Sequence, residues 1–240
     1  LLVVESGRIT QLGDAELLIG ELDISVKIHD YTRKIICPGF VDTHVHYPQL
    51  AIIGSYGESL LHWLENYAFD EEKKFNDADH SLKTANYFLD ELLRCGTTTA
   101  QVFGTVHPES VEGFFTAAEH RDLRMICGKV LMDRNGPQGL LDTPETSYID
   151  SKNLIERWHG RGRLRYAVSP RFAPTSTPDQ LATAGQLLRE YPGTHLQTHL
   201  SEDKEEINWV KSLFPSCKNY LDVYKRAGLL GKRSTFAHCC

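Results

Sequence analysis

Four histidines stand at or near the ends of short apolar runs, where they could bind a metal ion. His44 and His46 form an H-x-H pair that closes the first run. His199 ends a later run, and His238 lies near the end of the last one. Residues two apart in a strand point to the same face, so the H-x-H pair can reach one ion. Imidazole nitrogens suit zinc, with iron(II) as the alternative, and we predict one such site here.

Each of these histidines, taken singly, also fits an ordinary structural role. An H-x-H pair is a weak signal, and a lone histidine such as His199 is more often hydrogen-bonded within a core. The joint pattern is more specific, because three separate runs end in histidine at equivalent places. Catalytic residues of parallel α/β folds gather at the carboxyl ends of the strands, so the pattern favours a shared site.

Glu202 follows His199 by three residues, at a predicted junction between a strand and a helix. From this position its carboxylate could reach a water molecule on the metal and act as a proton carrier. The alternative is that Glu202 only stabilises the first turn of a helix, where the dipole favours acidic residues. The neighbouring His199 makes the catalytic interpretation the stronger one.

Three further residues could bind a flat polar substrate. Arg171 and Phe172 end the fourth run, where a guanidinium could clamp a carbonyl or carboxylate and an aromatic ring could stack on a heterocycle. A surface salt bridge is an equally good explanation of Arg171 alone. Gln49 lies just past the H-x-H pair, and its amide can both donate and accept a hydrogen bond.

The elements that must position these residues alternate along the chain. The apolar runs, predicted to be parallel strands, cover 35–46, 97–104, 124–132, 164–172, 194–201 and 234–239. Segments with helical spacing of apolar residues lie between them, at 81–95, 108–121, 144–159, 177–191 and 202–214. This alternation predicts an α/β fold, either an open sheet or a TIM-type barrel.

The predicted strands are too few for a closed barrel. A closed (β/α)8 barrel has eight strands in about 250 residues, whereas residues 35–240 supply about six βα units. We therefore expect an incomplete TIM-type barrel over 35–240 and a chain that is a piece of a longer protein. Residues 1–34 contain short alternating runs at 1–5, 8–11 and 25–28, which predict a few small strands of a β-sandwich-like domain.

Composition excludes several functional classes. The 240 residues are 41% hydrophobic and 24% charged, with a formal net charge of −6, and no apolar run approaches the length of a membrane span. The acidic balance argues against a nucleic-acid partner, and no basic segment followed by an apolar one opens the chain. The six cysteines include no C-x-x-C pair. We expect a cytoplasmic protein with reduced thiols and no membrane partner.

Several motifs together resemble the amidohydrolase superfamily of metal-dependent hydrolases, and within it the guanine deaminase family in its bacterial form. The first is Pro38-Gly39-Phe40-Val41-Asp42-Thr43-His44-Val45-His46, typical of the first barrel strand. The others follow in order along the chain: 44–49, 61–67, 96–100, 169–172 and 198–202. The likeness covers nearly the whole chain and implies a (β/α)8 barrel preceded by a small β segment.

The resemblance also implies a set of roles. His44, His46 and His199 would ligate one zinc ion per chain, and His238 would complete the ligand set or orient the reacting water. Glu202 would take a proton from that water and pass it to a ring nitrogen while guanine is hydrolysed to xanthine and ammonia. The implied substrate-binding residues are His46, Gln49, Arg171, Phe172, His199 and Glu202. A homodimer is implied by the resemblance alone.

Two alternatives remain open. The first is a related enzyme that keeps the metal site but deaminates another aminated heterocycle. The second is a catalytically silent metal-binding or purine-binding fragment. The resemblance implies a further aspartate ligand on the last barrel strand, so we expect this 240-residue piece to be inactive by itself. The fourth run carries Arg171 and no lysine, which disfavours a two-metal site bridged by a modified lysine.

Overall fold

The computed structural model describes residues 1–57 and 59–240, and the chain divides into two compact units, Leu1–Pro38 and Gly39–Cys240. The smaller unit contains an antiparallel pair, β1 (Leu2–Glu5) and β2 (Arg8–Leu12), and a short helix, α1 (Ala15–Ile19). Ser6 and Gly7 connect the two strands with φ angles of 49° and 75°, the left-handed conformation that suits a tight hairpin.

The strand expected at 25–28 is absent, because this segment is a turn followed by irregular chain. The Asp23 carboxylate accepts hydrogen bonds from the backbone N–H and the hydroxyl of Ser25, at 2.8 and 2.6 Å. Such local bonds from a side chain to the backbone compete with the extended conformation. Apolar alternation alone was therefore a poor guide in this segment.

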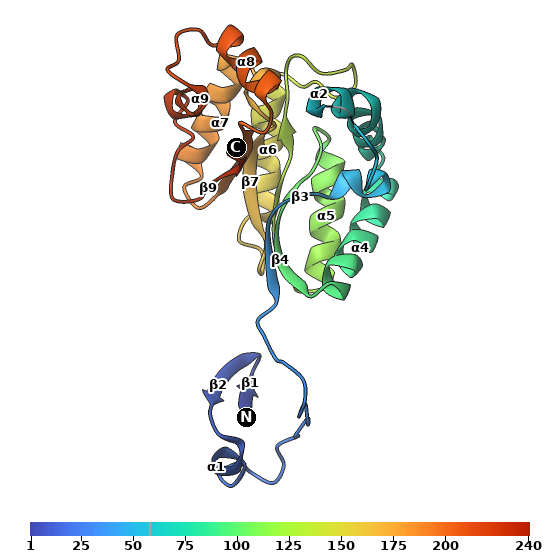
Figure 1. Cartoon of the computed structure of the whole chain (residues 1–240), viewed down its shortest axis with the longest axis vertical. Coiled ribbons are helices and arrows are strands. Elements are labelled where there is room, and N and C mark those ends of the chain that lie inside the picture. The colour runs from blue at the N-terminus through green and yellow to red at the C-terminus, as the bar shows by residue number, and fades with distance from the viewer. Residues whose placement is uncertain (58) are drawn as a thin grey trace. The chain divides into compact units, whose positions relative to one another are not determined.

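The larger unit is built on a parallel sheet whose strands run in the order β3-β4-β5-β7-β8-β9 (Figure 1). This confirms the six predicted strands and the parallel α/β fold. A short extra strand, β6 (Val130–Leu131), pairs with β7. The other strands are β3 (Phe40–His46), β4 (Thr97–Phe103), β5 (Arg124–Gly128), β7 (Arg165–Pro170), β8 (His195–Leu200) and β9 (Ser234–His238).

The sheet curves so that strands far apart in its order face each other across the interior. Gln101 in β4 donates to the Leu196 carbonyl of β8 at 3.2 Å, and Gln197 in β8 donates to the Val102 carbonyl of β4 at 2.9 Å. Thr235 in β9 donates to the Gln101 side chain at 3.0 Å. Among the described residues no strand pairing joins β3 to β9, so the larger unit is a partial barrel.

Helices follow most of the strands and lie on the outer side of the curved sheet (Figure 1). Their starts are set by side chains that cap the first turn, including Asp77, Thr143 and Thr177. These helices are α4 (Ala78–Arg94), α5 (Pro108–His120), α6 (Pro144–Trp158), α7 (Pro178–Glu190), α8 (Lys204–Leu213) and α9 (Tyr220–Arg226). In the part of the chain that the structure describes, no helix is long and apolar enough to cross a bilayer.

The segment after β3 is helical but irregular. It contains 3-10 turns at Tyr47–Ile52 and Lys73–Asn76, and a π-helical turn at Leu64–Ala68 between α2 (Leu60–Trp63) and α3 (Phe69–Glu72). Short π-helical turns are frequent beside functional sites. Because no element here keeps one helical period for long, sequence periodicity did not reveal it. The predicted first strand also begins at Phe40, five residues later than expected.

Candidate active site

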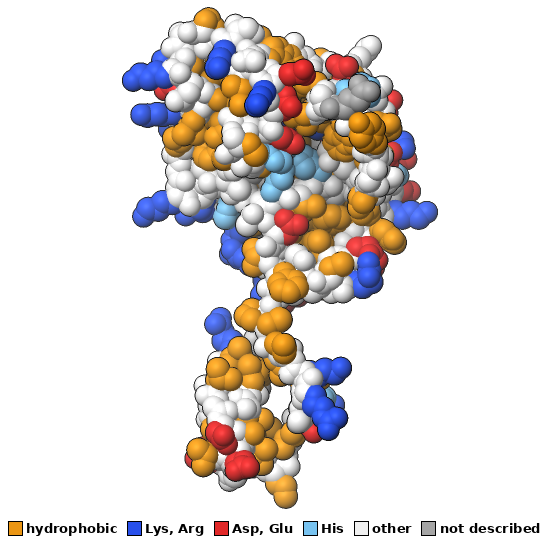
Figure 2. All heavy atoms as spheres, in the orientation of Figure 1, with side chains coloured by type: hydrophobic (Ala, Val, Ile, Leu, Met, Phe, Trp, Pro, Cys, Tyr) orange, Lys and Arg blue, Asp and Glu red, His pale blue; other side chains and the backbone are white. Residues whose placement is uncertain are grey.

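Four histidine side chains converge at the carboxyl ends of three strands. His44 and His46 lie in β3, His199 in β8, and His238 at the end of β9. The His44 ring centroid is 5.1 Å from that of His46, 4.8 Å from that of His199 and 5.0 Å from that of His238. Figure 2 shows histidine side chains gathered on one face of the larger unit, with acidic side chains beside them.

The spacing of the ring nitrogens fits a single metal ion. One ring nitrogen from each of His44, His199 and His238 lies within 4.8 Å of the others. The Nε2 atoms of His46 and His199 are 2.9 Å apart. Two nitrogens on a tetrahedral zinc, with bonds of about 2.0–2.1 Å, would lie roughly 3.3 Å apart. His44, His199 and His238 thus form one cluster of possible ligand atoms, and His46 lies next to it through its contact with His199.

A second hydrogen bond orients His199 for such a role. Its Nδ1 lies 2.7 Å from the carbonyl oxygen of Arg171, which can only accept, so Nδ1 carries the hydrogen and Nε2 keeps its lone pair. Support of this kind from a carbonyl or carboxylate is a general feature of metal-binding histidines. The His46 ring stacks on Phe103 at 4.5 Å, which fixes its plane.

Burial favours the neutral form of the three histidines in the strands β3 and β8. Burial lowers the pKa of His44 to about 4, with the nearby His238 as the next cause. Burial also lowers the pKa of His46 and of His199 well below the usual value, and each is lowered further by a histidine neighbour. A metal binds the neutral imidazole, and the lowered pKa values of His44, His46 and His199 favour that form.

Glu202 lies beside the histidines and outside the helix that follows. Helix α8 begins at Lys204 with Asp203 as its N-cap, so the alternative of an acidic residue in the first helical turn does not hold. The backbone N–H of Glu202 donates to the buried Glu206 carboxylate at 2.8 Å, and Ser201 before it has a φ of 54°. The Glu202 side chain lines the same cavity as the histidines.

The Glu202 carboxylate has a partner and a raised pKa. Its Oε2 is 3.2 Å from Nε2 of His238. Burial, followed by the negative charge of Glu206, raises the pKa of Glu202 to about 7. A carboxyl group that titrates near neutral pH can both accept and release a proton during a reaction.

All eight residues singled out in the sequence line one cavity of about 560 Å³, which is in the usual range for small-molecule sites. Arg171 is 3% exposed and Phe172 is 4% exposed, so Arg171 is not in the exposed salt bridge that was its alternative explanation. The eight residues are His44, His46, Gln49, Arg171, Phe172, His199, Glu202 and His238.

Sequence reasoning missed several residues at this cavity. Trp63 and Leu64 line it, and they belong to the segment 61–67 that carried a family motif but no assigned role. Glu72 does not line the cavity, yet it contacts both Arg171 and Gln49. Its only sequence context is a run of charged residues at 70–74, which is typical of a solvated surface. No local signal distinguished Glu72 from its neighbours.

Comparison with known proteins places these observations in a family. The family model described as Amidohydrolase family matches residues 35–240. Guanine deaminase of Escherichia coli (strain K12) is 53% identical over 239 residues, covering 100% of this chain and 54% of that protein. The probable guanine deaminase of Deinococcus radiodurans is 41% identical, covering 99% of this chain and 55% of that protein.

Solved structures give the same picture. The structure of E. coli guanine deaminase matches with a TM-score of 0.97 and 52% identity, covering 99% of this chain and 55% of that one. Guanine deaminase from C. acetobutylicum with bound guanine in the active site matches with a TM-score of 0.90 and 32% identity, covering 99% and 57%. This chain therefore spans about half the length of the relatives it matches.

Proposed function

Because this chain belongs to the amidohydrolase family, we propose that the protein it represents hydrolyses guanine to xanthine and ammonia. The observation that carries the proposal is the convergence of four histidines, a carboxyl group and two polar side chains on one cavity. The identity to guanine deaminases and the match to a guanine-bound structure support guanine over another aminated heterocycle.

We propose that one zinc ion per chain is held by His44, His46, His199 and His238, with iron(II) as the alternative. The donor set supports this, since neutral imidazoles are good ligands for both metals. A metal ion held there would polarise a water molecule so that the water could attack at neutral pH. His238 would either ligate the ion or, through its contact with Glu202, orient that water.

Glu202 is proposed as the group that moves protons. Its carboxylate would accept a proton from the attacking water and release it to a ring nitrogen of the substrate. The carbon that bears the exocyclic amine then gains the water oxygen, and ammonia leaves after a second proton has reached the amine nitrogen. The raised pKa and the position beside His238 both support this role.

The polar side chains of the cavity wall would bind the polar edge of the purine. Arg171 would donate hydrogen bonds to an acceptor on the ring, and the amide of Gln49 would bind a neighbouring polar position. Phe172 would cover a ring face, and His46 and His199 would touch the substrate near the reacting carbon. Since Arg171 is charged and almost fully buried, it favours a substrate edge with a carbonyl oxygen.

The test uses the full gene product, with bound metal measured per chain and ammonia release measured with guanine, adenine, cytosine and aminotriazines. Ammonia from guanine in a metal-dependent manner would support the proposal. Ammonia only from another heterocycle would favour the related enzyme, and metal binding without turnover would favour a silent binding protein. The homodimer and the cytoplasmic location stay predictions, and light scattering would test the first.

A further inference from the structure

Glu72 lies behind the cavity wall and is 1% exposed. It is the last residue of α3, and its carboxylate has three polar contacts with two cavity residues. Nη1 of Arg171 is 2.6 Å from its Oε2, and Nη2 of Arg171 is 3.1 Å from its Oε1. Nε2 of Gln49 donates to the same Oε1 at 3.0 Å. One buried carboxylate thus holds both side chains proposed to read the substrate.

These contacts fix which atoms the two side chains can offer. An ionised carboxylate only accepts hydrogen bonds, so Gln49 must turn its Nε2 toward Glu72 and its amide oxygen away. The bidentate pair sets the plane of the Arg171 guanidinium, which also lies over the Phe69 ring at 5.3 Å. Gln49 and Arg171 both line the cavity, and their remaining atoms are the ones available to a ligand.

We propose that Glu72 is a positioning residue that sets the specificity of the site, an inference that rests on the proposed function. By holding Arg171 as a donor and Gln49 as an acceptor, it selects a ring edge that offers a carbonyl oxygen beside an N–H group. Oxopurines such as guanine have this pattern. In 2,6-diaminopurine an amine replaces the carbonyl, so the pattern is reversed.

Replacing the carboxylate with an amide would remove this constraint while keeping the shape. In Glu72→Gln, position 72 can offer either an oxygen or an N–H group to Gln49, so the Gln49 amide can face the cavity either way. Arg171 also loses its counter-charge and its bidentate partner. The site would then bind guanine less well and discriminate less between guanine and 2,6-diaminopurine.

The experiment compares wild type and Glu72→Gln in the full gene product, with kcat and KM for guanine and 2,6-diaminopurine and bound metal per chain. We expect KM for guanine to rise about tenfold to hundredfold, as for the loss of a charged hydrogen bond, with the metal content unchanged. The preference for guanine should fall by about tenfold or more. Glu71→Gln is the matched control, because Glu71 lies in the same helix but pairs with Lys74 at 2.5 Å.

Several outcomes would overturn the proposal. A folded Glu72→Gln protein with wild-type KM and wild-type preference would do so, and so would an equal effect of Glu71→Gln. If Glu72→Gln does not fold, Glu72→Asp keeps the charge but is too short to hold both partners, and a wild-type KM in that variant would refute the role.

The failure of the proposed function would be visible separately. If the wild-type protein releases no ammonia from guanine, calorimetry with guanine replaces the kinetic assay. Binding that is about tenfold weaker in Glu72→Gln than in wild type would still support the positioning role. Equal binding, or no binding by wild type, would overturn it.

Discussion

The Nε2 atoms of His46 and His199 lie 2.9 Å apart although 153 residues separate them in sequence. The two residues come from β3 and β8, which are not neighbours in the sheet. Their approach therefore depends on the curvature that also brings Gln101 and Gln197 into contact with the opposite strands. The site cannot form on a flat sheet of the same strand order.

Removal of one histidine should empty the metal site. We expect His199→Asn in the full gene product to lower metal affinity by at least about a hundredfold, because loss of even a supporting contact costs roughly ten- to a hundredfold. Metal analysis after dialysis against a weak chelator would measure this. His62→Asn is the control, because His62 is exposed on α2. Full metal occupancy in His199→Asn would contradict the assignment.

Loss of the Glu202 carboxylate should slow turnover without loss of metal. Positioned general acids and bases contribute about 10² to 10⁴ in rate, so kcat for guanine in Glu202→Gln should fall within that range. The control is Glu205→Gln, an exposed residue in the first turn of α8. A Glu202→Gln enzyme with wild-type kcat would show that another group carries the proton.

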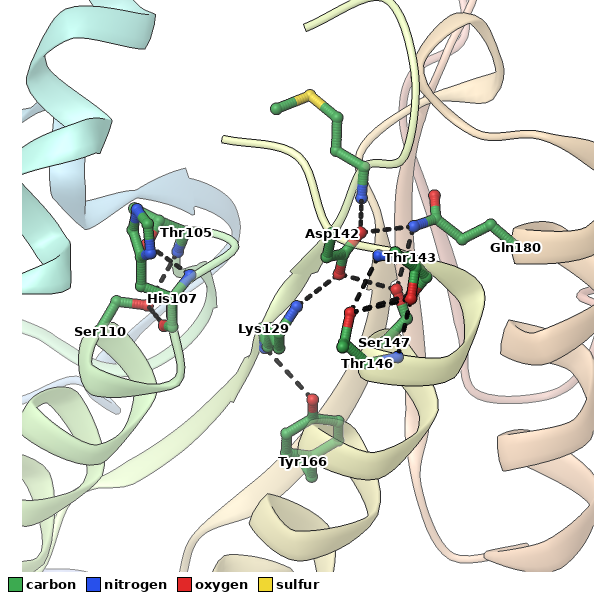
Figure 3. Close-up of polar contacts among 11 residues, drawn as sticks. Thr105, His107, Ser110, Lys129, Asp142, Thr143, Thr146, Ser147, Tyr166 and Gln180 are labelled. Atoms are coloured by element: carbon green, nitrogen blue, oxygen red, sulfur yellow. Dashed lines mark hydrogen bonds and ion pairs between the residues drawn. The ribbon is translucent and has the colours of Figure 1, made fainter. Parts of the chain in front are cut away.

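A buried ion pair away from the cavity should be important for stability. The Asp142 carboxylate accepts from Lys129 at 2.5 Å, Ser147 at 2.7 Å and Gln180 at 2.7 Å (Figure 3). Lys129 is 1% exposed, so Asp142→Asn removes the carboxylate that pairs with its buried charge. Loss of one partner of a buried pair costs about 3–5 kcal/mol, which urea unfolding should detect.

The control for this measurement is Asp122→Asn. Asp122 is 81% exposed and has a φ of 48°, a conformation that asparagine also tolerates. We expect its free energy of unfolding to stay close to that of wild type. Equal unfolding midpoints for the two variants would show that the ion pair does not stabilise the fold.

Acid should destabilise the fold through His195, the first residue of β8. Burial, followed by the positive charge of Arg233 and Arg124, lowers the pKa of His195 to about 4. Because the ordinary histidine pKa is about 6.5, the unfolded chain takes up this proton first as the pH falls. The contribution of His195 to stability is therefore complete above about pH 6.5 and declines from there toward pH 4.

Urea unfolding at several pH values between 7.5 and 4.5 would measure this decline. His195→Gln should depend less on pH than wild type, because the group that titrates is gone. His120→Gln is the matched control, since His120 is exposed at the end of α5. The same pH dependence in wild type and His195→Gln would contradict the prediction.

The sequence was sufficient to predict the repeating architecture and the principal site residues. Helices of regular period, such as α5 and α7, began within one residue of the expected positions because Pro108 and Pro178 mark their first turns. His44, His46 and His199 could be selected because strand ends meet at one edge of a parallel sheet. These predictions needed only the spacing of apolar residues along the chain and the rule that parallel strands end at the same edge of a sheet.

The rest required information from distant parts of the chain. Glu72 sits in a charged run like many surface segments, and only the fold reveals that Arg171, 99 residues away, neutralises it. Residues 47–52 and 60–76 change between 3-10, α and π geometry, so no single period describes them. The strand predicted at 25–28 is wrong, because the hydrogen bond from the Ser25 backbone to the Asp23 carboxylate favours a turn there.

Arg171 links two parts of the site through its own covalent structure. Its carbonyl oxygen holds Nδ1 of His199, while its guanidinium binds Glu72. The distance between His199, at the proposed reacting centre, and the Arg171 guanidinium, which would bind the far edge of the ring, is thus limited by the length of the Arg171 side chain. A ligand whose reactive carbon and far polar edge do not match that length would fit poorly, whatever its other contacts. Substitutions of the Arg171 side chain should therefore change substrate choice, while the backbone carbonyl of residue 171 can still hold His199.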